Sequence, residues 1–195
     1  MQFKKLAAFF LVLAGLFAAS APAVAADPEN TMVITLKDGD VTVALRPDLA
    51  PKHVAQIKKL VREGAYDNVV FHRVIDGFMA QTGDVQYGNA KKGFSASAVG
   101  TGGSSLPDLP AEFSGEHFVR GVVGMARAQN PNSANSQFCI MFASAPNLDG
   151  QYTIVGTVEK GMELVDNIKK GDDARNGSVD DPDRMVKVRI AADAK

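Results

Sequence analysis

The 195-residue sequence predicts an all-β protein, because its periodic segments are mostly short strands and only two of them are helices. The predicted strands are rich in β-branched and other apolar residues. They span residues 31–36, 41–45, 69–75, 119–125, 137–142, 152–158 and 185–190. This pattern alone does not distinguish a barrel from a sandwich.

The first two strands form a predicted hairpin, and a helix follows them. The segment between residues 31–36 and 41–45 contains an Asp-Gly pair, which is a hairpin signal. Pro51 can open a helix, as proline does at a first helical position, and Gly64 can end it. The apolar residues of this helix share one face and are Val54, Ile57, Leu60 and Val61.

The second half of the chain begins with a predicted long loop. Residues 87–113 are rich in Gly, Ser, Ala and Pro and show little periodicity, and loops of this length are usually functional. Between the last two strands, Met162, Val165 and Ile168 lie on one face of a second helix that Gly171 can end. The sequence has no internal repeat, so we expect a single domain over residues 26–195.

The N-terminus has the features of a secretory signal peptide over residues 1–25. Lys4 and Lys5 form a basic start, an apolar run follows over residues 6–19, and Ala23–Ala25 supplies a cleavage pattern. A retained membrane anchor is the alternative, but the run is shorter than the ~20 residues of a spanning helix. We therefore expect export to the periplasm and no membrane attachment after cleavage.

Charge and cysteine content narrow the class of function. Residues 1–25 carry two lysines and no acid, so 19 basic and 22 acidic residues remain beyond them, a net charge of −3. This balance argues against a nucleic-acid partner. Cys139 is the single cysteine, so no intramolecular disulfide can form. This fits a bacterial periplasmic protein, while the N-terminal segment alone leaves a eukaryotic secretory route open. The histidines show no metal-ligand spacing, and we expect no metal or other cofactor.

The most informative segment is Phe71–Asp84. It places a permanent cation, Arg73, near an amide, Gln81, and near two large apolar side chains, Phe78 and Met79. No nucleophile or acid–base pair accompanies them, and arginine keeps its proton in proteins. Such a site suits a reaction that moves charge without moving protons. Rotation about an Xaa–Pro amide bond is a reaction of this kind.

Residues 71–84 and four later segments together resemble the cyclophilins, a family of peptidyl-prolyl cis-trans isomerases. The later segments follow in the family's order and approximate spacing, and they are Gly121–Ala128, Asn135–Phe138, Leu148–Tyr152 and Gly156–Met162. The resemblance extends from about Thr31 to Ile190. It implies a closed eight-stranded antiparallel barrel, with the two helices covering its open ends.

The resemblance also implies which residues form the site. Arg73 matches the family's electrostatic catalyst, and Gln81 matches the amide that supports it. The implied substrate-binding residues are His72, Phe78, Met79, Ala126, Arg127, Ala128, Gln137, Cys139, Leu148 and Tyr152. No metal ligand is implied.

Two positions depart from the family pattern in ways that affect binding. The family usually has phenylalanine at the position of Cys139, where it forms the floor of the proline pocket. The smaller cysteine predicts a shallow floor and weaker substrate binding, unless Phe142 or Met79 fills the gap. Asn147 stands where cyclosporin-sensitive members carry tryptophan, so we expect weak cyclosporin binding.

Together these features predict an exported, monomeric prolyl isomerase that accelerates the folding of proline-containing polypeptides without a cofactor. A proline-peptide holdase with little turnover is the first alternative, motivated by Cys139 and Asn147. A hydrolase is the second alternative. It would need a serine or cysteine beside a histidine, and the sequence shows no such motif.

Overall fold

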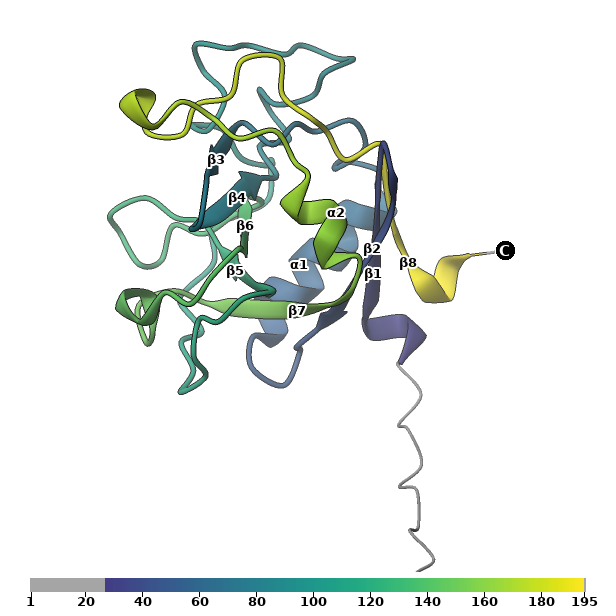
Figure 1. Ribbon diagram of the computed structural model, residues 1–195. Helices are drawn as coiled ribbons and strands as arrows, with labels where there is room; N and C mark the ends of the chain where they lie inside the picture. Colours follow the sequence, from purple (N-terminus) through teal and green to yellow (C-terminus); the bar gives the residue numbers. More distant parts are fainter. Residues whose placement is uncertain (1–26, 195) are drawn as a thin grey trace, which may run out of the picture.

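A computed structural model describes residues 27–194, so the predicted signal peptide lies outside the described residues (Figure 1). The strands are β1 (Thr31–Leu36), β2 (Gly39–Leu45), β3 (Arg73–Ile75), β4 (Met79–Thr82), β5 (Val122–Met125), β6 (Phe138–Met141), β7 (Ile154–Lys160) and β8 (Lys187–Ile190). The α-helices are α1 (Pro51–Arg62) and α2 (Met162–Asp166), and the 3₁₀ helices are η1 (Pro28–Asn30), η2 (Pro146–Leu148), η3 (Asp173–Arg175) and η4 (Ala191–Asp193). Within residues 27–194, no helix is both long and apolar enough to cross a bilayer.

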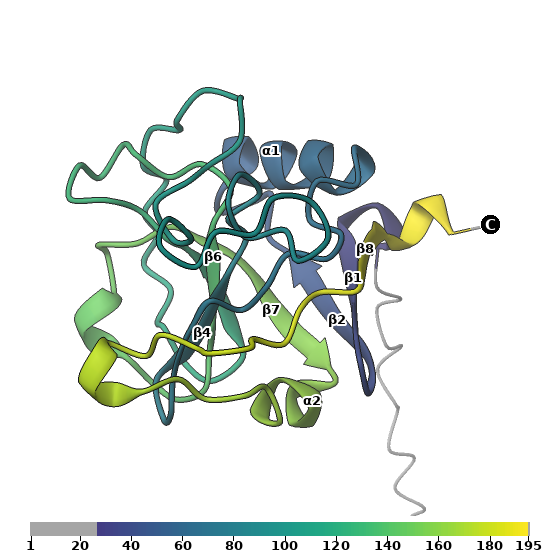
Figure 2. The ribbon, with the colours of Figure 1, turned by 90° about the horizontal axis from the view of Figure 1, so that it is seen from above.

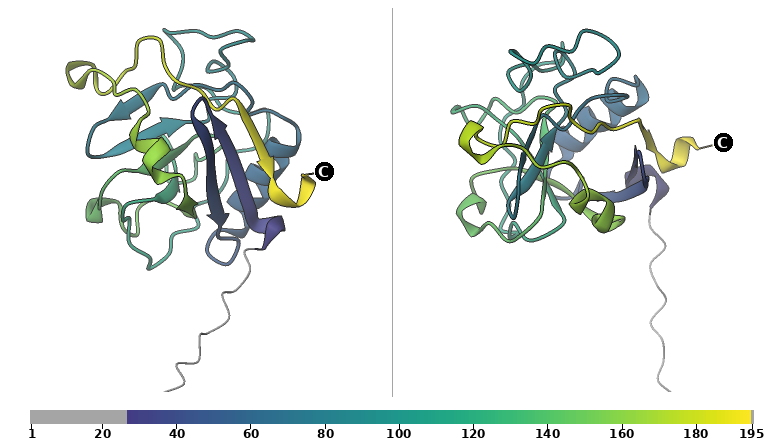
Figure 3. Two further views of the ribbon diagram at one scale, coloured as in Figure 1. Left: turned by 45° about the vertical axis from the view of Figure 1, so that its right-hand side comes forward. Right: turned by 45° about the horizontal axis from the view of Figure 1, so that its top comes forward.

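All these strands form one antiparallel sheet in the order β3-β4-β6-β5-β7-β2-β1-β8. The predicted Asp-Gly hairpin joins β1 and β2, with Leu36 paired to Gly39, and Figure 3 shows β8 on the other side of β1. The sheet curls around its own core. The all-β class, the antiparallel arrangement and the two α-helices are therefore confirmed.

The predicted closed barrel is wrong, because the sheet is an open half-barrel with β3 and β8 as its edges. The strand expected over residues 69–75 is regular only in its last three residues. Its earlier part bonds to two different segments: the N–H of Val70 donates to the carbonyl of Gly88, whereas that of Phe71 donates to the carbonyl of Asp183. Isolated bridges therefore cross the gap between the edges in place of a continuous ladder.

The inner face of the half-barrel carries the main hydrophobic core. Strand residues such as Val43, Val123 and Ile140 pack there with Ile57 of α1 and Val165 of α2, and all five are essentially excluded from solvent. Figure 2 shows the two helices on opposite sides of the curled sheet. Both helices therefore close the core from the two ends of the half-barrel, where the strands leave it open.

The outer face carries a second, smaller hydrophobic group, called the outer cluster below. Its buried members are Met79, Phe118, Val122, Met141, Ala145 and Ile154. Successive side chains in a strand point to opposite faces, so Met79 joins the outer cluster while Ala80 joins the inner core. Burial on both faces removes the alternation of polar and apolar residues, which is why the pattern did not predict β4.

The long loop predicted over residues 87–113 contains no helix or named strand, and it caps α1. The carboxylate of Glu112 accepts the backbone N–H groups of Lys52 and His53 and lies 2.6 Å from the ring Nδ1 of His53. Ala50, before the helix, has no side chain that could cap it. Glu112 therefore supplies from the loop the acceptor that the first turn of α1 needs.

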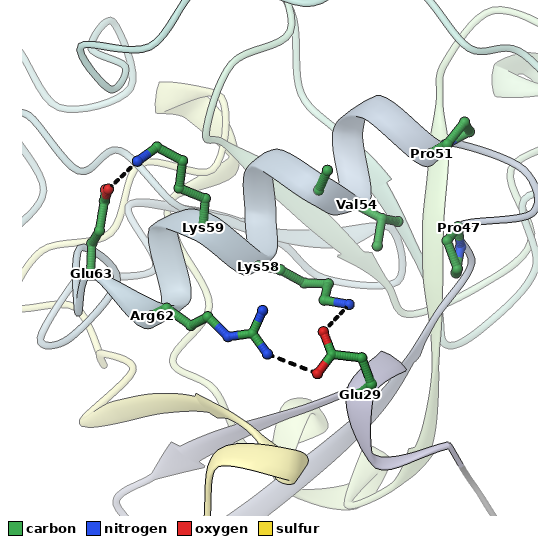
Figure 4. A pocket seen from close by; sticks show the side chains of 9 residues that line it. Glu29, Pro47, Pro51, Val54, Lys58, Lys59, Arg62 and Glu63 are labelled. Carbon is green, nitrogen blue, oxygen red and sulfur yellow. Dashed lines mark hydrogen bonds and ion pairs between the residues drawn. The ribbon is translucent and has the colours of Figure 1, made fainter.

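Ion pairs fasten both ends of the described chain to α1, and Figure 4 shows those of Glu29 at the N-terminal end. The carboxylate of Glu29 accepts from Arg62 at 2.8 Å and from Lys58 at 2.5 Å, and Arg62 also donates to Asp193 at 2.9 Å. Glu29, Lys58 and Arg62 border a groove of about 570 Å³ along the exposed side of α1. Because its charges already pair with one another, the groove presents no free group for catalysis.

The pKa of Glu29 is lowered from 4.5 to about 2, first by the hydrogen bond from Arg62 and then by that from Lys58. A depressed folded-state pKa means that this stabilisation is complete above pH 4.5 and is lost as the pH falls toward 2. We predict that Glu29→Gln flattens the fall in unfolding temperature over this interval, measured by circular dichroism. Glu163→Gln, an exposed acid on α2, is the matched control. Equal pH dependence in both variants would contradict the prediction.

Candidate active site

The register of four neighbouring strands places the two predicted catalytic residues in one row. Arg73 of β3 pairs with Gln81 of β4. Gln81 pairs in turn with Cys139 of β6, and Cys139 pairs with Gly124 of β5. Residues directly opposite each other in adjacent strands have their side chains on the same face. The row lies on the outer face, because Met79 and Met141, two positions away in their strands, belong to the outer cluster.

Asn176 accepts two hydrogen bonds from the Arg73 side chain and so fixes its position. The Nε of Arg73 donates to the backbone carbonyl of Asn176 at 3.0 Å, and Nη2 donates to its Oδ1 at 2.9 Å. On the other side, Nη1 donates to Oε1 of Gln81 at 3.3 Å. All three acceptors are neutral, and no carboxylate within residues 27–194 pairs with Arg73. A guanidinium has five N–H donors, so Arg73 keeps both its charge and free donors for a substrate.

The backbone conformation at Asn176 and Gly177 places Asn176 within hydrogen-bond distance of Arg73. Asn176 ends η3 in the left-handed region with φ of 55°, a conformation that asparagine tolerates better than most residues. The next residue, Gly177, passes so close to β3 that a Cβ there would lie 2.5 Å from Cγ1 of Ile75. The N–H of Val74 donates to the Gly177 carbonyl at 2.8 Å, which fixes this approach.

A chain of amides continues the row away from Arg73. The Nε2 of Gln81 donates to Oε1 of Gln137 at 2.9 Å. The Nε2 of Gln137 donates to the carbonyls of Gly100 and Gly102 at 3.0 and 2.8 Å. Since both donors of Gln137 are committed to backbone carbonyls, its oxygen must face Gln81, and the oxygen of Gln81 must then face Arg73. The long loop thus orients the polar side of the site.

A pocket of about 220 Å³ opens beside Arg73 on this face. The guanidinium of Arg127 lies over the ring of Tyr152 at 4.3 Å and closes one side of it. The lining is largely apolar and consists of Arg73, Phe78, Met79, Gln81, Phe118, Gly124, Met125, Ala126, Arg127, Cys139, Met141, Leu148 and Tyr152. An apolar hollow bordered by two guanidiniums, neither of them paired with a carboxylate of the described chain, suits a small apolar ring next to a polar group.

A second groove of about 400 Å³ continues from this pocket, with which it shares Gln81, Ala126 and Arg127. Its other walls come from the long loop and from the segment before β6. They are Gly100, Thr101, Gly102, Ala128, Ser133, Asn135, Ser136 and Gln137. The two hollows together form one track on the outer face, long enough for residues on both sides of a bound ring.

The structure brings eleven of the twelve predicted site residues to this track, and His72 is the exception. The ring of His72 is buried, and a Cβ on Gly100 would lie only 3.2 Å from it. Neither ring nitrogen has a hydrogen-bond partner, and burial lowers the pKa of His72 to about 4. A neutral ring packed beneath the loop lies outside the pocket, so the geometry supports packing rather than substrate contact.

Cys139 lies half-buried at the bottom of the pocket, where burial raises the pKa of its thiol to about 12. A thiol with such a pKa is protonated at neutral pH and is a poor nucleophile. Within residues 27–194, no group of three or more His, Cys, Asp or Glu side chains could hold a metal ion. Cys139 therefore does not supply the activated thiol that the hydrolase alternative would need.

The comparisons with known proteins identify the family. The family model for "Cyclophilin type peptidyl-prolyl cis-trans isomerase/CLD" matches residues 31–190. The chain belongs to the cyclophilin-type peptidyl-prolyl cis-trans isomerases. A Brucella suis protein named "Probable peptidyl-prolyl cis-trans isomerase" is 71% identical over 171 residues, which cover 88% of this chain and 87% of the relative. An isomerase of Arabidopsis thaliana is 35% identical over 164 residues, which cover 83% and 71%.

Solved cyclophilin structures share the fold of this cyclophilin. A crystal structure of a cyclophilin from Hirschia baltica has a TM-score of 0.72 at 26% identity and covers 87% of this chain and 76% of its own. A Cryptosporidium parvum cyclophilin, crystallised in the presence of the dipeptide Ala-Pro, has a TM-score of 0.69 at 27% identity and covers 82% and 98%. Both likenesses extend over most of this chain.

Several residues of the site were not predicted from the sequence: Gly124, Met125 and Met141 of the pocket lining, and also Asn176 and Phe118. Asn176 precedes a glycine after an acidic segment, and an Asn-Gly pair is a signal for a left-handed turn. That signal predicts the turn but not the residue it faces. Phe118 was placed just before a predicted strand, and only the tertiary structure turns its ring into the pocket.

We predict that Asn176→Gly lowers kcat about tenfold or less and leaves KM nearly unchanged, because a hydrogen bond to a charged group is lost. Glycine keeps the left-handed backbone and its carbonyl bond to Arg73, so only the Oδ1 contact is removed. Asn176→Asp keeps an acceptor oxygen but pairs Arg73 with a carboxylate, so it should also lower kcat. An unchanged kcat in Asn176→Gly would show that Asn176 does not position Arg73.

Proposed function

We propose that this cyclophilin uses Arg73 to accelerate Xaa–Pro rotation in polypeptides exported to the periplasm. The observation that carries the proposal is the state of the guanidinium. It is fixed by three neutral acceptors, paired with no carboxylate of the described chain, and placed at the side of an apolar pocket. Arg127 also borders the pocket without a carboxylate partner, but its guanidinium is stacked on the Tyr152 ring and donates to the backbone carbonyls of Ala128 and Gln151.

The chemistry requires a fixed donor rather than a base. Rotation about an amide breaks its resonance and has a barrier of about 18–20 kcal/mol. In the twisted state the proline nitrogen regains a lone pair, so a donor aimed at it stabilises that state more than either planar state. Arg73 provides the donor, and Gln81 fixes its direction. No proton is transferred, which agrees with the neutral His72 and the protonated Cys139.

The apolar pocket holds the proline ring in this proposal, and the adjoining groove holds the residues before it. Phe78, Met79 and Leu148 supply apolar walls for a ring. Small side chains at Ala126 and Ala128 leave room for a peptide backbone to approach. The Ala-Pro dipeptide named with the Cryptosporidium parvum cyclophilin supports a proline-containing ligand class.

The export route rests on the sequence features of residues 1–25. Cleavage before Ala26 would release a monomeric protein with no membrane attachment, no nucleic-acid partner and, given Asn147, weak cyclosporin binding. We expect the protein to appear in the periplasmic fraction with Ala26 as its first residue, by mass spectrometry of the N-terminal peptide. A cytoplasmic protein that keeps Met1 would contradict this route.

We predict that Arg73→Ala lowers kcat/KM about 10²- to 10³-fold, the usual effect of removing one preorganised transition-state donor. Exchange cross-peaks between the cis and trans forms of an Ala-Pro peptide measure the turnover by NMR. Arg73→Lys keeps the positive charge but loses the planar guanidinium with its fixed N–H donors, so its isomerase activity should also be impaired. Arg46→Ala, which removes a surface arginine paired with Asp48, is the control. A folded Arg73→Ala protein with wild-type exchange would refute the role of Arg73.

A further inference from the structure

Two small residues and one ring from another segment lie next to one another in the lining of the pocket. Gly124 and Cys139 are directly paired on β5 and β6 and line the pocket side by side. A Cβ on Gly124 would lie 2.5 Å from Cε1 and 2.9 Å from Cζ of Phe118. No real side chain fits at that distance, so the Phe118 ring occupies the space that any other residue at position 124 would need.

The backbone of Phe118 is fixed at both of its polar groups. Its N–H donates to Oδ1 of Asp149 at 2.8 Å, and its carbonyl accepts the N–H of Ala145 at 2.8 Å. Asp149 directly follows Leu148, another wall of the pocket. The same loop that supplies Leu148 therefore also sets the position of the Phe118 ring.

The remaining neighbours fix the ring itself. Phe118 is only 2% exposed and packs in the outer cluster with Met79 and Met141, which also line the pocket. By contrast, Phe142 belongs to the inner core, on the other side of the sheet. Of the two residues expected to compensate for the small Cys139, Met79 lines the pocket and Phe142 does not.

We propose that Phe118 is a specificity-determining residue of this isomerase and forms the aromatic floor on which the substrate's proline ring rests. Gly124 and Cys139 act with it, because their small size admits the ring. The inference rests on the proposed function of the pocket. It replaces the expectation of a shallow floor and weak binding with that of a normal floor, built from the irregular segment before β5.

Substitutions at positions 118 and 139 should depend on each other, because both side chains compete for the same space. A phenylalanine at position 139 would enter the same layer that Phe118 already fills, so Cys139→Phe alone should damage binding rather than improve it. In the Phe118→Ala variant the space of the Phe118 ring is vacant, so adding Cys139→Phe should supply a new ring and restore the floor. Cys139→Phe should therefore weaken peptide binding when residue 118 is phenylalanine and strengthen it when residue 118 is alanine.

The experiment compares wild type, Phe118→Ala, Cys139→Phe and the double variant with an Ala-Pro peptide. NMR titration gives the dissociation constant, and exchange cross-peaks give the turnover rate of the bound peptide. We expect each single variant to weaken binding about tenfold or more, the scale for a lost apolar contact in a pocket, and the double variant to recover most of this loss. The turnover rate should change little, because Arg73 is untouched.

Circular dichroism checks that each variant is folded. If Phe118→Ala does not fold, Phe118→Leu and Gly124→Ala replace it as tests of the Phe118 ring. Leucine keeps the apolar volume without the ring, and the Cβ of alanine at position 124 displaces it. Both should weaken peptide binding. Unchanged binding in a folded Phe118 variant, or tighter binding in Cys139→Phe alone, would overturn the proposal. Wild type that binds the peptide without exchange would refute the isomerase mechanism, and the dissociation constants would still test the floor.

Discussion

The site depends on the register of β3, β4, β6 and β5, since that register gathers residues from four strands into one row. Arg73, Gln81, Cys139 and Gly124 follow one another across the sheet on its outer face. A slip of one residue in any of these pairings would turn that strand's side chains to the opposite face. The inner core prevents such a slip, because Val74, Ala80 and Ile140 would then leave it.

The outer face therefore provides what a reaction without proton transfer needs. Its cation is held by uncharged groups, so the positive charge of Arg73 is not neutralised before a substrate arrives. Burial keeps both Cys139 and His72 uncharged at neutral pH, so neither supplies a competing charge or a nucleophile. The loop after η3 and the long loop over residues 87–113 are both used to orient side chains of the row.

Local patterns predicted most of the fold but not its closure. The hairpin of β1 and β2 and the start of α1 at Pro51 follow from short-range signals that the structure confirms. The sequence pattern did not predict β4, because both faces of this strand are buried. The barrel stays open because the residues before β3 form hydrogen bonds with two different segments. Phe118 and Asn176 could not be predicted, since each reaches the site only through contacts distant in sequence.

In the proposed mechanism, a bound proline ring lies on the outer face between Met79 and Phe118, with Arg73 at its side. The most direct measurement is a set of isotope-filtered NOEs between the labelled protein and an unlabelled Ala-Pro peptide. We predict contacts from the proline ring protons to the Phe118 ring and to the methyl groups of Met79 and Leu148. Contacts to the groove along α1, for example to Val54, with none to Phe118 or Met79, would contradict the account.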